Sequence, residues 1–212
     1  MTQLPVTELD GLADAIRGKV ANGTRRYLIG LAGAPGSGKS TAAAQLGEVL
    51  GGELAVVVPM DGFHLAQNLI EGTPLQDRRG APDTFDVGGY LNLLRRLRAN
   101  EEPVIYAPSF RRPLEDPIAA AIAIPQDVPV VITEGNYLLL DRSGWGEIRA
   151  LLDETWYVIV PDEIRVSRLV QRHIGSGKSG ADATAWVNGP DAANALLIES
   201  TRDNADGVLE WS

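Results

Sequence analysis

Short apolar runs alternate with amphipathic segments along this chain of 212 residues. Such continuous apolar runs are typical of parallel strands that are buried on both faces. They occupy residues 27–31 (YLIGL), 54–59 (LAVVVP), 128–133 (VPVVIT) and 154–160 (ETWYVIV), and residues 205–211 are a candidate last strand. Other segments have the spacing of apolar residues that is typical of helices. They are residues 7–20, 41–50, 87–99, 145–152, 182–186 and 191–201, together with a further helix that begins at Pro161. This alternation predicts an α/β fold with a mostly parallel sheet between layers of helices, a three-layer arrangement.

The first predicted strand leads directly into a glycine-rich loop and a helix. Residues 33–41 (GAPGSGKST) match the pattern G-x-x-x-x-G-K-S/T at every fixed position. Glycines let successive backbone N–H groups turn toward a phosphate, and the helix that follows offers its N-terminus to the same anion. We expect Lys39 to reach the β- and γ-phosphates, Ser40 to hold Mg²⁺ and Thr41 to contact the α-phosphate. The predicted nucleotide-binding residues are Gly33, Ala34, Pro35, Gly36, Ser37, Gly38, Lys39, Ser40 and Thr41.

Two acidic residues follow predicted strands and are candidates for the chemistry. Asp61 follows the strand at residues 54–59, at the sheet edge where α/β proteins bind ligands, and is suited to accept the proton of a substrate hydroxyl. Glu134 closes the strand at residues 128–133, where a carboxylate can orient Mg²⁺ opposite Ser40. A turn-forming Asp-Gly pair and a plain strand-end carboxylate are the alternative interpretations. We interpret the nearby His64 as a packing residue or a neighbour of the site.

Arginines recur at spacings of three and four on the helix that begins at Pro161. Arg165, Arg168 and Arg172 therefore share one face, and the helix leads into a glycine-punctuated stretch at residues 175–180 (GSGKSG). That stretch resembles a phosphate loop but lacks its first glycine and does not follow a strand, so we predict a mobile loop. We expect a lid near residues 172–190 that brings Arg168 and Arg172 onto the transferred phosphoryl group. A solvated basic stripe is the alternative.

Two segments interrupt the alternation of strands and helices. Residues 71–86 (EGTPLQDRRGAPDTFD) are too polar for a core and too long for a simple connection, and we expect Arg79 and Asp83 there to bind substrate. Residues 103–124 contain short strand-like runs around SFRRPLEDPIAA, which predicts a β-excursion. That excursion would carry Tyr106, Phe110, Arg111 and Arg112 toward a ligand, with Tyr106 and Arg111 as predicted substrate contacts. A solvated loop and a surface hairpin are the alternatives, and we predict a single domain over residues 1–212.

Composition limits the classes of partner. The formal net charge of −9 disfavours nucleic acid and anionic membranes, which call for basic surfaces, so a phosphate site must be locally positive. The chain has no cysteine and therefore no disulfide or thiolate metal site. No apolar stretch approaches the ~20 residues of a membrane-spanning helix, and MTQLPVTELD does not read as a signal peptide. We expect a cytoplasmic protein with no nucleic-acid partner and no membrane insertion, and a homodimer stays open.

Five motifs in order carry a family resemblance. GAPGSGKST, MDGFHL, RRGAPDTFD, TEGNYLL and RVSRLVQRH resemble the P-loop enzymes of the uridine kinase, phosphoribulokinase and type I pantothenate kinase family. The chain looks most similar to short bacterial proteins described as sugar (fructose) transport system kinases. The resemblance implies that Asp61 is the base, that Asp83 holds substrate hydroxyls and that Glu134 serves Mg²⁺. It also implies that Arg165 and Arg168 lie near the acceptor and phosphates, with Arg172 and Lys178 in the lid.

The chain also departs from these relatives at the acceptor site. Uridine kinases carry a Tyr-Asp-Phe segment followed by a His and an Arg, whereas this chain has YAPSFRR without a histidine there. The resemblance therefore does not imply uracil recognition. Pantothenate and phosphoribulose kinases have additional acceptor elements with no counterpart in this chain.

These observations predict a kinase that uses ATP and Mg²⁺. It would transfer the γ-phosphoryl group to a hydroxyl of a small molecule, which is a sugar, a nucleoside or a pantothenate-like acceptor. Asp61, Lys39 and Arg168 are the predicted catalytic residues. The alternative is a regulatory or transport-associated P-loop ATPase or GTPase without a small-molecule acceptor. That alternative lacks support from an Asn-Lys-x-Asp guanine-reading segment or an LSGGQ signature, because neither occurs in the chain.

Overall fold

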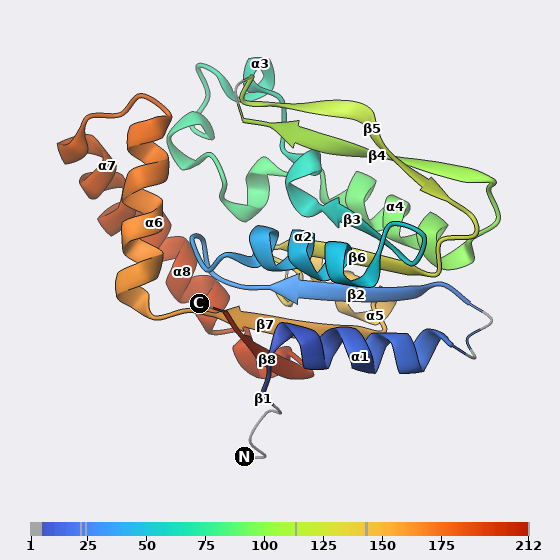
Figure 1. The fold of residues 1–212 in the computed structure, drawn as a ribbon. Coiled ribbons are helices and arrows are strands. Elements are labelled where there is room, and N and C mark those ends of the chain that lie inside the picture. Colours follow the sequence, from blue (N-terminus) through green and yellow to red (C-terminus); the bar gives the residue numbers. More distant parts are fainter. Residues whose placement is uncertain (1–5, 22, 24, 113, 143, 212) are drawn as a thin grey trace.

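The computed structural model describes residues 6–21, 23, 25–112, 114–142 and 144–211, so the predictions for residues 1–5 lie outside the described part. Its centre is a parallel sheet of six strands in the order β1-β8-β7-β2-β6-β3 (Figure 1). The strands are β1 (Val6–Thr7), β2 (Tyr27–Ala32), β3 (Ala55–Pro59), β6 (Val130–Gly135), β7 (Glu154–Ile159) and β8 (Gly207–Glu210). Four predicted apolar runs form β2, β3, β6 and β7, and β6 is buried along its whole length. The predicted α/β class is confirmed.

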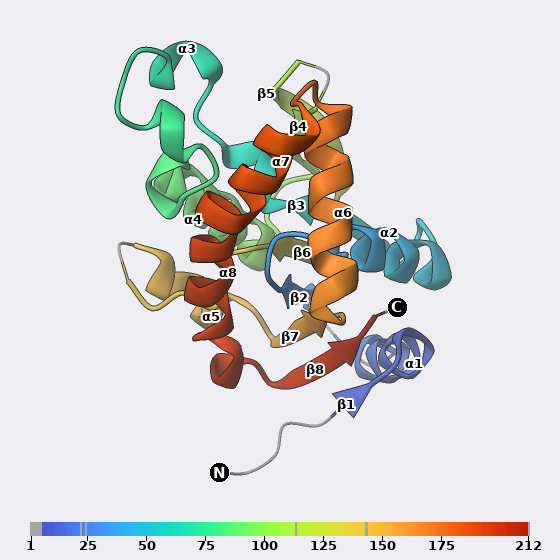
Figure 2. The same cartoon turned by 90° about the vertical axis from the view of Figure 1, so that its left-hand side faces the viewer.

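Helices cover both faces of this sheet. They are α1 (Leu9–Val20), α2 (Lys39–Leu50), α3 (Gln67–Ile70), α4 (Val87–Ala99), α5 (Ile148–Leu151), α6 (Asp162–Gly175), α7 (Gly180–Trp186) and α8 (Ala192–Glu199), and a π-helical turn at Val187–Asp191 joins the last two. One hydrophobic core lies between the sheet and α1 and α2, and a second lies between the sheet and α4, α5 and α8 (Figure 2). Helices α1, α2, α4, α5 and α8 thus bury apolar side chains against strands that are apolar on both faces, which gives the predicted three layers.

The excursion at residues 103–124 is an antiparallel hairpin of β4 (Val104–Arg111) and β5 (Asp116–Pro125), separate from the main sheet. It is longer than the two apolar runs predicted, because the polar residues next to its tip also pair, Arg111 with Asp116. The register shifts between Ala107 and Ser109. Pro108 lies at that shift and lacks a backbone N–H, so it favours a bulge over a regular ladder.

Two other predicted elements differ in detail. Val6–Thr7 form an edge strand that pairs with β8, so the first helix begins at Leu9 with Glu8 as its N-cap rather than at Thr7. The helix predicted at residues 145–152 is a 3₁₀ turn, Trp145–Glu147, followed by the short α5. The loop at residues 71–86 contains 3₁₀ turns at Gln76–Arg78 and Pro82–Thr84.

The buried side of α4 provides a test of the second core. Leu94 is fully buried there, while its neighbour Arg95 is exposed and pairs with Glu147. We expect Leu94→Ala to lower the free energy of unfolding by about 2–5 kcal/mol through lost packing and a residual cavity. Arg95→Ala should lower it by no more than about 1 kcal/mol, because exposed ion pairs contribute little. Urea denaturation measures both, and equal losses would contradict this assignment of the core.

Candidate active site

A cavity of about 1300 Å³ opens at the carboxyl edge of the sheet. Because the strands are parallel, the segments that follow β2, β3, β6 and β7 all begin at this edge. Register places them side by side, since Glu134 on β6 lies between Leu31 on β2 and Pro59 on β3. The phosphate loop follows β2 and Asp61 follows β3, so the sheet brings both to either side of Glu134.

The phosphate loop has the geometry that its glycines predict. Gly36 and Gly38 have φ angles of 81° and 85°, in the left-handed region that favours glycine. A Cβ on Gly38 would lie 2.6 Å from the indole of Trp211 and 3.0 Å from Nη1 of Arg168, so a side chain there would also collide with its neighbours. Helix α2 begins at the next residue, Lys39, and directs the free N–H groups of its first turn toward the cavity. This arrangement is suited to bind phosphate.

Lys39, which lines the cavity, and the buried Glu134 on β6 interact electrostatically. Glu134 is only 3% exposed. Burial raises the pKa of Glu134 to about 7, and the Lys39 ammonium and the Ser40 hydroxyl act in the opposite direction. Burial likewise lowers the pKa of Lys39, opposed by the Glu134 and Asp61 carboxylates. Each charge therefore depends on its partner to remain ionised in this poorly solvated place.

Glu134 and Ser40 also fit a magnesium site. Carboxylate and hydroxyl oxygens are ligands that Mg²⁺ prefers, and the ion commonly takes its other ligands from substrate phosphates and water. A bound cation would favour the charged form of Glu134, which burial disfavours. The described residues contain no cluster of three or more metal-binding side chains, and a site that shares its ion with a nucleotide does not need one.

Asp61 lies in a 3₁₀ turn, Met60–Phe63, directly after β3. Its side chain is 31% exposed, and its two carboxylate oxygens face different neighbours. Nε2 of His64 lies 3.9 Å from Oδ1, and Nη2 of Arg112 lies 3.9 Å from Oδ2. Both distances exceed that of a hydrogen bond. Asp61 is therefore held near two groups while its oxygens stay available to accept a proton from a bound hydroxyl.

His64 forms an aromatic wall of the cavity. Its ring centroid lies 4.0 Å from that of Phe85 and 4.9 Å from that of Phe110. Burial lowers the pKa of His64 to about 4, with the Asp61 carboxylate opposing this shift and Arg79 and Arg112 adding to it. The side chain therefore presents a neutral imidazole at ordinary pH. The sequence indicated a packing residue, and the structure adds that this residue lines the cavity.

The hairpin contributes other residues to the cavity wall than the two that the sequence predicted. Along β4, Ile105 and Ala107 are buried, so strict alternation would turn Arg111 inward as well. The bulge at Pro108 shifts the alternation by one residue, and Phe110 and Arg112 line the cavity instead. Arg111 is exposed and Tyr106 is 55% exposed, and neither is among the lining residues. Tyr106 and Arg111, the predicted substrate contacts, therefore lie outside the lining of this cavity, and for Arg111 the signal in the sequence was Pro108.

The loop before α4 contributes one of its two predicted residues to the cavity. Arg79 lines it and donates to Oε1 of Gln67 and to the carbonyl of Glu115, which joins the loop to α3 and the hairpin tip. Asp83 is exposed, pairs with Arg78 and is not among the lining residues. The structure therefore does not bring Asp83 together with Asp61.

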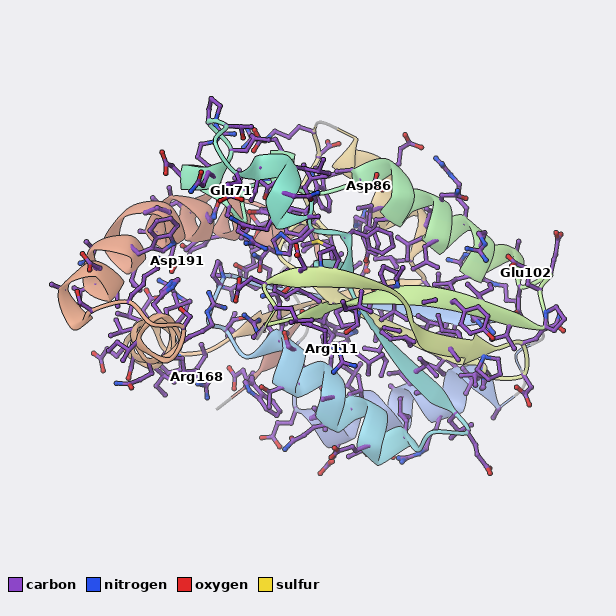
Figure 3. All side chains as sticks on the ribbon, turned by 90° about the horizontal axis from the view of Figure 1, so that it is seen from above. Glu71, Asp86, Glu102, Arg111, Arg168 and Asp191 are labelled. Carbon is purple, nitrogen blue, oxygen red and sulfur yellow. The ribbon has the colours of Figure 1, made fainter. Side chains whose placement is uncertain are left out.

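Helix α6 brings two of its three predicted arginines to the wall of the cavity. Arg168 and Arg172 line the cavity, whereas Arg165 pairs with Asp162 at 2.9 Å and does not. Nη1 of Arg168 is buried and has no hydrogen-bond partner among the residues that the structure describes. In Figure 3, Arg168 on α6 and Asp191 on the segment between α7 and α8 lie at the same end of the molecule. The arginine face is thus directed at the site, and a buried N–H there calls for an anionic acceptor.

The segment at residues 172–190, for which a lid is predicted, contains the end of α6, a short connection, α7 and most of the π-helical turn. Ser179 caps α7 by accepting a hydrogen bond from the backbone N–H of Asp182. Nε2 of His173 and Oδ2 of Asp191 are 2.7 Å apart, which ties α6 to the π-helical turn. Lys178 lies over the ring of Trp186 at 4.4 Å. The sequence did not single out the cavity-lining residues Gln67, Asn136, His173, Trp186, Asp191 and Asn194, because long-range packing, not local spacing, brings them to the cavity.

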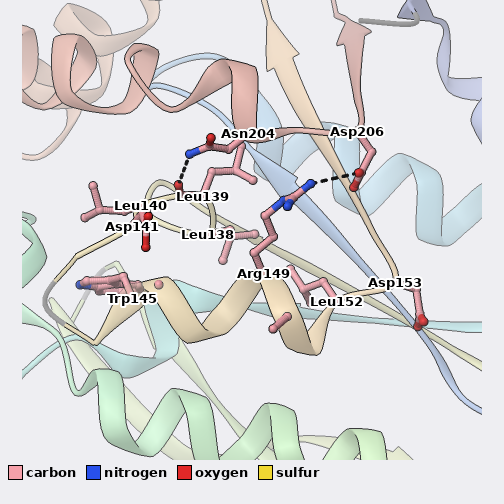
Figure 4. Close-up of a pocket in the computed structure, with 12 residues that line it drawn as sticks. Leu138, Leu139, Leu140, Asp141, Trp145, Arg149, Leu152, Asp153, Asn204 and Asp206 are labelled. Carbon is pink, nitrogen blue, oxygen red and sulfur yellow. Dashed lines mark hydrogen bonds and ion pairs between the residues drawn. The ribbon is translucent and has the colours of Figure 1, made fainter.

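A second cavity of about 450 Å³ lies near the amino ends of β7 and β8 (Figure 4). Among its charged groups, Arg149 pairs with Asp206 at 3.2 Å, and Asp206 also accepts a hydrogen bond from the backbone N–H of Thr155. Asn204 donates to the carbonyl of Leu139. None of the predicted site residues lines this cavity.

The low pKa of His64 predicts how stability depends on pH. An unfolded histidine binds a proton below about pH 6.5, whereas folded His64 resists protonation down to about pH 4. This histidine therefore contributes stability above pH 6.5 that is lost as the pH falls toward 4, by up to about 3 kcal/mol. Chemical denaturation between these pH values should show a flatter profile for His64→Gln than for the wild type. Phe110→Leu, which removes a ring but no titrating group, should keep the wild-type slope.

Comparisons with known proteins show to which family this chain is related. The profile of the phosphoribulokinase/uridine kinase family matches residues 28–209. A protein of Schizosaccharomyces pombe named "putative uridine kinase C227.14" is 35% identical over 88% of this chain and 83% of its own. Escherichia coli YggC, described as uncharacterized, is 33% identical over 92% of this chain and 81% of its own.

Solved structures give the same result. A "putative fructose transport system kinase" from Silicibacter sp. TM1040 superposes with a TM-score of 0.86 and 39% identity, over 97% of this chain and 100% of the other. A "possible uridine kinase" from Bacillus stearothermophilus, at 20% identity and a TM-score of 0.65 over 95% of this chain and 96% of its own, shares the fold. Within the described residues, no helix is long and apolar enough to cross a membrane. The chain belongs to the phosphoribulokinase/uridine kinase family of P-loop kinases.

Proposed function

We propose that the protein transfers the γ-phosphoryl group of ATP to a hydroxyl of a small molecule. One observation carries this proposal: the phosphate loop with Lys39 and the accessible carboxylate of Asp61 open into the same cavity. A protein that only binds or hydrolyses nucleotide needs the loop but has no evident use for a carboxylate positioned in this way. The wall of His64, Phe110 and Arg112 around Asp61 supports a place for an acceptor.

The residues of the cavity divide the work of phosphoryl transfer. The loop N–H groups and Lys39 hold the β- and γ-phosphates, and Ser40 and Glu134 would hold Mg²⁺, which supplies further neutralisation of phosphate charge. Asp61 accepts the proton of the acceptor hydroxyl as its oxygen bonds to the γ-phosphorus. The bond from that phosphorus to the bridging oxygen then breaks, and ADP leaves. Arg168 and Arg172 offset the charge on the transferred group and exclude water, which limits hydrolysis of ATP.

Similar proteins support a small-molecule acceptor without identifying it. Two of them carry names that refer to uridine and to fructose. A D-glycerate 3-kinase from Cryptococcus neoformans shares the fold at 13% identity. We propose a sugar, a nucleoside or a pantothenate-like alcohol as the acceptor class, and a cytoplasmic location where ATP is available. The alternative, a regulatory or transport-associated ATPase or GTPase, would give the Asp61 carboxylate no role as a base.

Asp61→Asn tests the proposed base. The amide keeps the shape of the side chain but does not accept the proton, so phosphoryl transfer should fall by about 10²–10⁴-fold. Binding of a fluorescent ATP analogue should be unchanged. The acceptor is found by a screen of nucleosides, pantothenate and free sugars with ATP and Mg²⁺, with the product mass confirmed. Asp14→Asn, on the exposed side of α1, is the matched control, and full transfer by Asp61→Asn would exclude a base role.

Lys39→Ala tests the phosphate loop separately. Removing the ammonium leaves the Glu134 carboxylate buried without its cation and the phosphates without a contact, so turnover should fall by at least about 10²-fold. Nucleotide binding should weaken in the same titration. Circular dichroism serves to show that the fold is kept. A variant that is folded, binds ATP normally and turns over at the wild-type rate would argue against the proposed site.

A further inference from the structure

The acceptor end of the main cavity carries a positive charge that the proposed transfer does not itself require. We use the term acceptor end for the part lined by Asp61, His64, Arg79, Phe110 and Arg112. This charge limits which hydroxyl compounds can bind as the acceptor. The inference therefore rests on the proposed function. The surrounding chain is acidic, with a formal net charge of −9, which makes a local excess of cations informative.

The hairpin is built to hold Arg112 beside the base. A Cβ on Gly62 would lie 2.5 Å from the carbonyl oxygen of Pro108, so the bulge packs directly against the turn that carries Asp61. The tip is anchored as well, because Asp116 accepts a hydrogen bond of 2.7 Å from the backbone N–H of Gln67. Arg79 adds its hydrogen bond to the carbonyl of Glu115. Arg112 lies between these two attachments along the chain and lines the cavity, with its side chain 58% exposed.

The Arg112 guanidinium has no bonded anion among the described residues. Its contact with Asp61 is 3.9 Å long, which is an electrostatic contact and not a hydrogen bond. The other carboxylates nearby are placed differently. Asp191 is hydrogen-bonded to His173 at 2.7 Å. Glu115 is an exposed residue at the edge of the cavity. Arg112 is thus a cation with free donors at the position where the acceptor must lie.

A second cation faces Arg112 across the cavity. Arg172 reaches the same space from α6. Burial lowers the pKa of Arg172, and the Arg112 charge lowers it further, while Asp191, Asp61 and Glu115 act in the opposite direction. Like charges that face one another cost free energy, and an anion placed between them removes that cost.

The nucleotide accounts for the cations at the other end of the cavity. Lys39 and the loop N–H groups serve its phosphates, and the unpaired Nη1 of Arg168 lies next to Gly38 of the loop. Arg79 is engaged by Gln67 and the Glu115 carbonyl. His64 is kept neutral by burial, as its low pKa indicates. Arg112 therefore remains without an assigned anion, and it lies beside Asp61.

We propose that the acceptor is an acidic alcohol, which carries a carboxylate or a phosphate ester besides the hydroxyl that is phosphorylated. Arg112 binds the acid group, with Arg172 closing on it from α6, while Asp61 takes the proton of the hydroxyl. The planar guanidinium presents paired donors that match both kinds of oxyanion. His64 and Phe110 supply an apolar wall for the carbon skeleton.

Matched pairs of acidic and neutral alcohols test this proposal. The carboxylate arm compares glycerate with glycerol, gluconate with glucose, and pantothenate with panthenol, and the phosphate arm compares glucose 6-phosphate with glucose. Binding is measured by calorimetry in the presence of Mg²⁺ and a non-hydrolysable ATP analogue, and transfer is measured separately with ATP. We expect an acid in at least one arm to bind and its neutral counterpart to bind at least about 10-fold more weakly.

Variants of Arg112 assign the effect to this side chain. Arg112→Gln should weaken binding of the acid by about 10-fold or more while the KM for ATP stays unchanged, and Arg112→Lys should restore part of it. Arg95→Gln, an exposed arginine on α4, is the matched control. Failure of every acid to bind, or an acid whose affinity does not respond to Arg112→Gln, would overturn the proposal.

Separate measurements of binding and of transfer distinguish a failure of this inference from a failure of the kinase proposal. Transfer to a neutral alcohol as efficient as to its acid would support the kinase and overturn the acidic acceptor. Binding of an acid that depends on Arg112, without transfer to any compound that binds, would support the acidic ligand and count against the kinase.

Discussion

The pairing of β2 with β6 on one side and β7 on the other determines where the chemistry is located. These strands are parallel and buried, so their carboxyl ends deliver the phosphate loop, Glu134 and the start of α6 to one edge of the sheet. Hydrogen bonds set the register, and a shift by one residue would turn Glu134 away from Lys39 and Ser40. The geometry of the site is therefore a property of the sheet, and the loops add groups to positions that the strands define.

Charge compensation is the second constraint. Glu134 and Lys39 each lose favourable hydration, and each lessens the cost for the other. Such a pair contributes little net stability, since desolvation offsets attraction, yet loss of either member leaves a buried charge alone. The phosphates of a nucleotide would add negative charge beside Lys39, and a divalent cation would add positive charge beside Glu134. The site is thus prepared electrostatically for a ligand that carries both signs of charge.

The sequence predicted the parts of the site that depend on short-range order. Lys39 follows the glycine-rich loop after β2, Asp61 follows β3, and Glu134 lies at the end of β6. Strand order and spacing were therefore enough to place them at one edge. Arg111 does not line the cavity because a single bulge at Pro108 exchanges the faces of the strand beyond it. Tyr106, which precedes the bulge, lies on the exposed face of β4 between the buried Ile105 and Ala107. His173 and Asp191 were not found, since 18 residues and a π-helical turn separate them. A short edge strand such as β1 likewise has too few residues for a pattern to reveal it.

The order of strands in the sheet has a consequence for folding. Every partner of β2 is distant along the chain: Leu28 pairs with Val131, and Leu31 pairs with Trp156. At the edge, Val6 pairs with Val208. Contacts of such large sequence separation close slowly, because the entropy of long loops is lost before the contacts form. We expect the phosphate loop to stay without its final shape until the last strands arrive, so that nucleotide affinity would emerge late in folding.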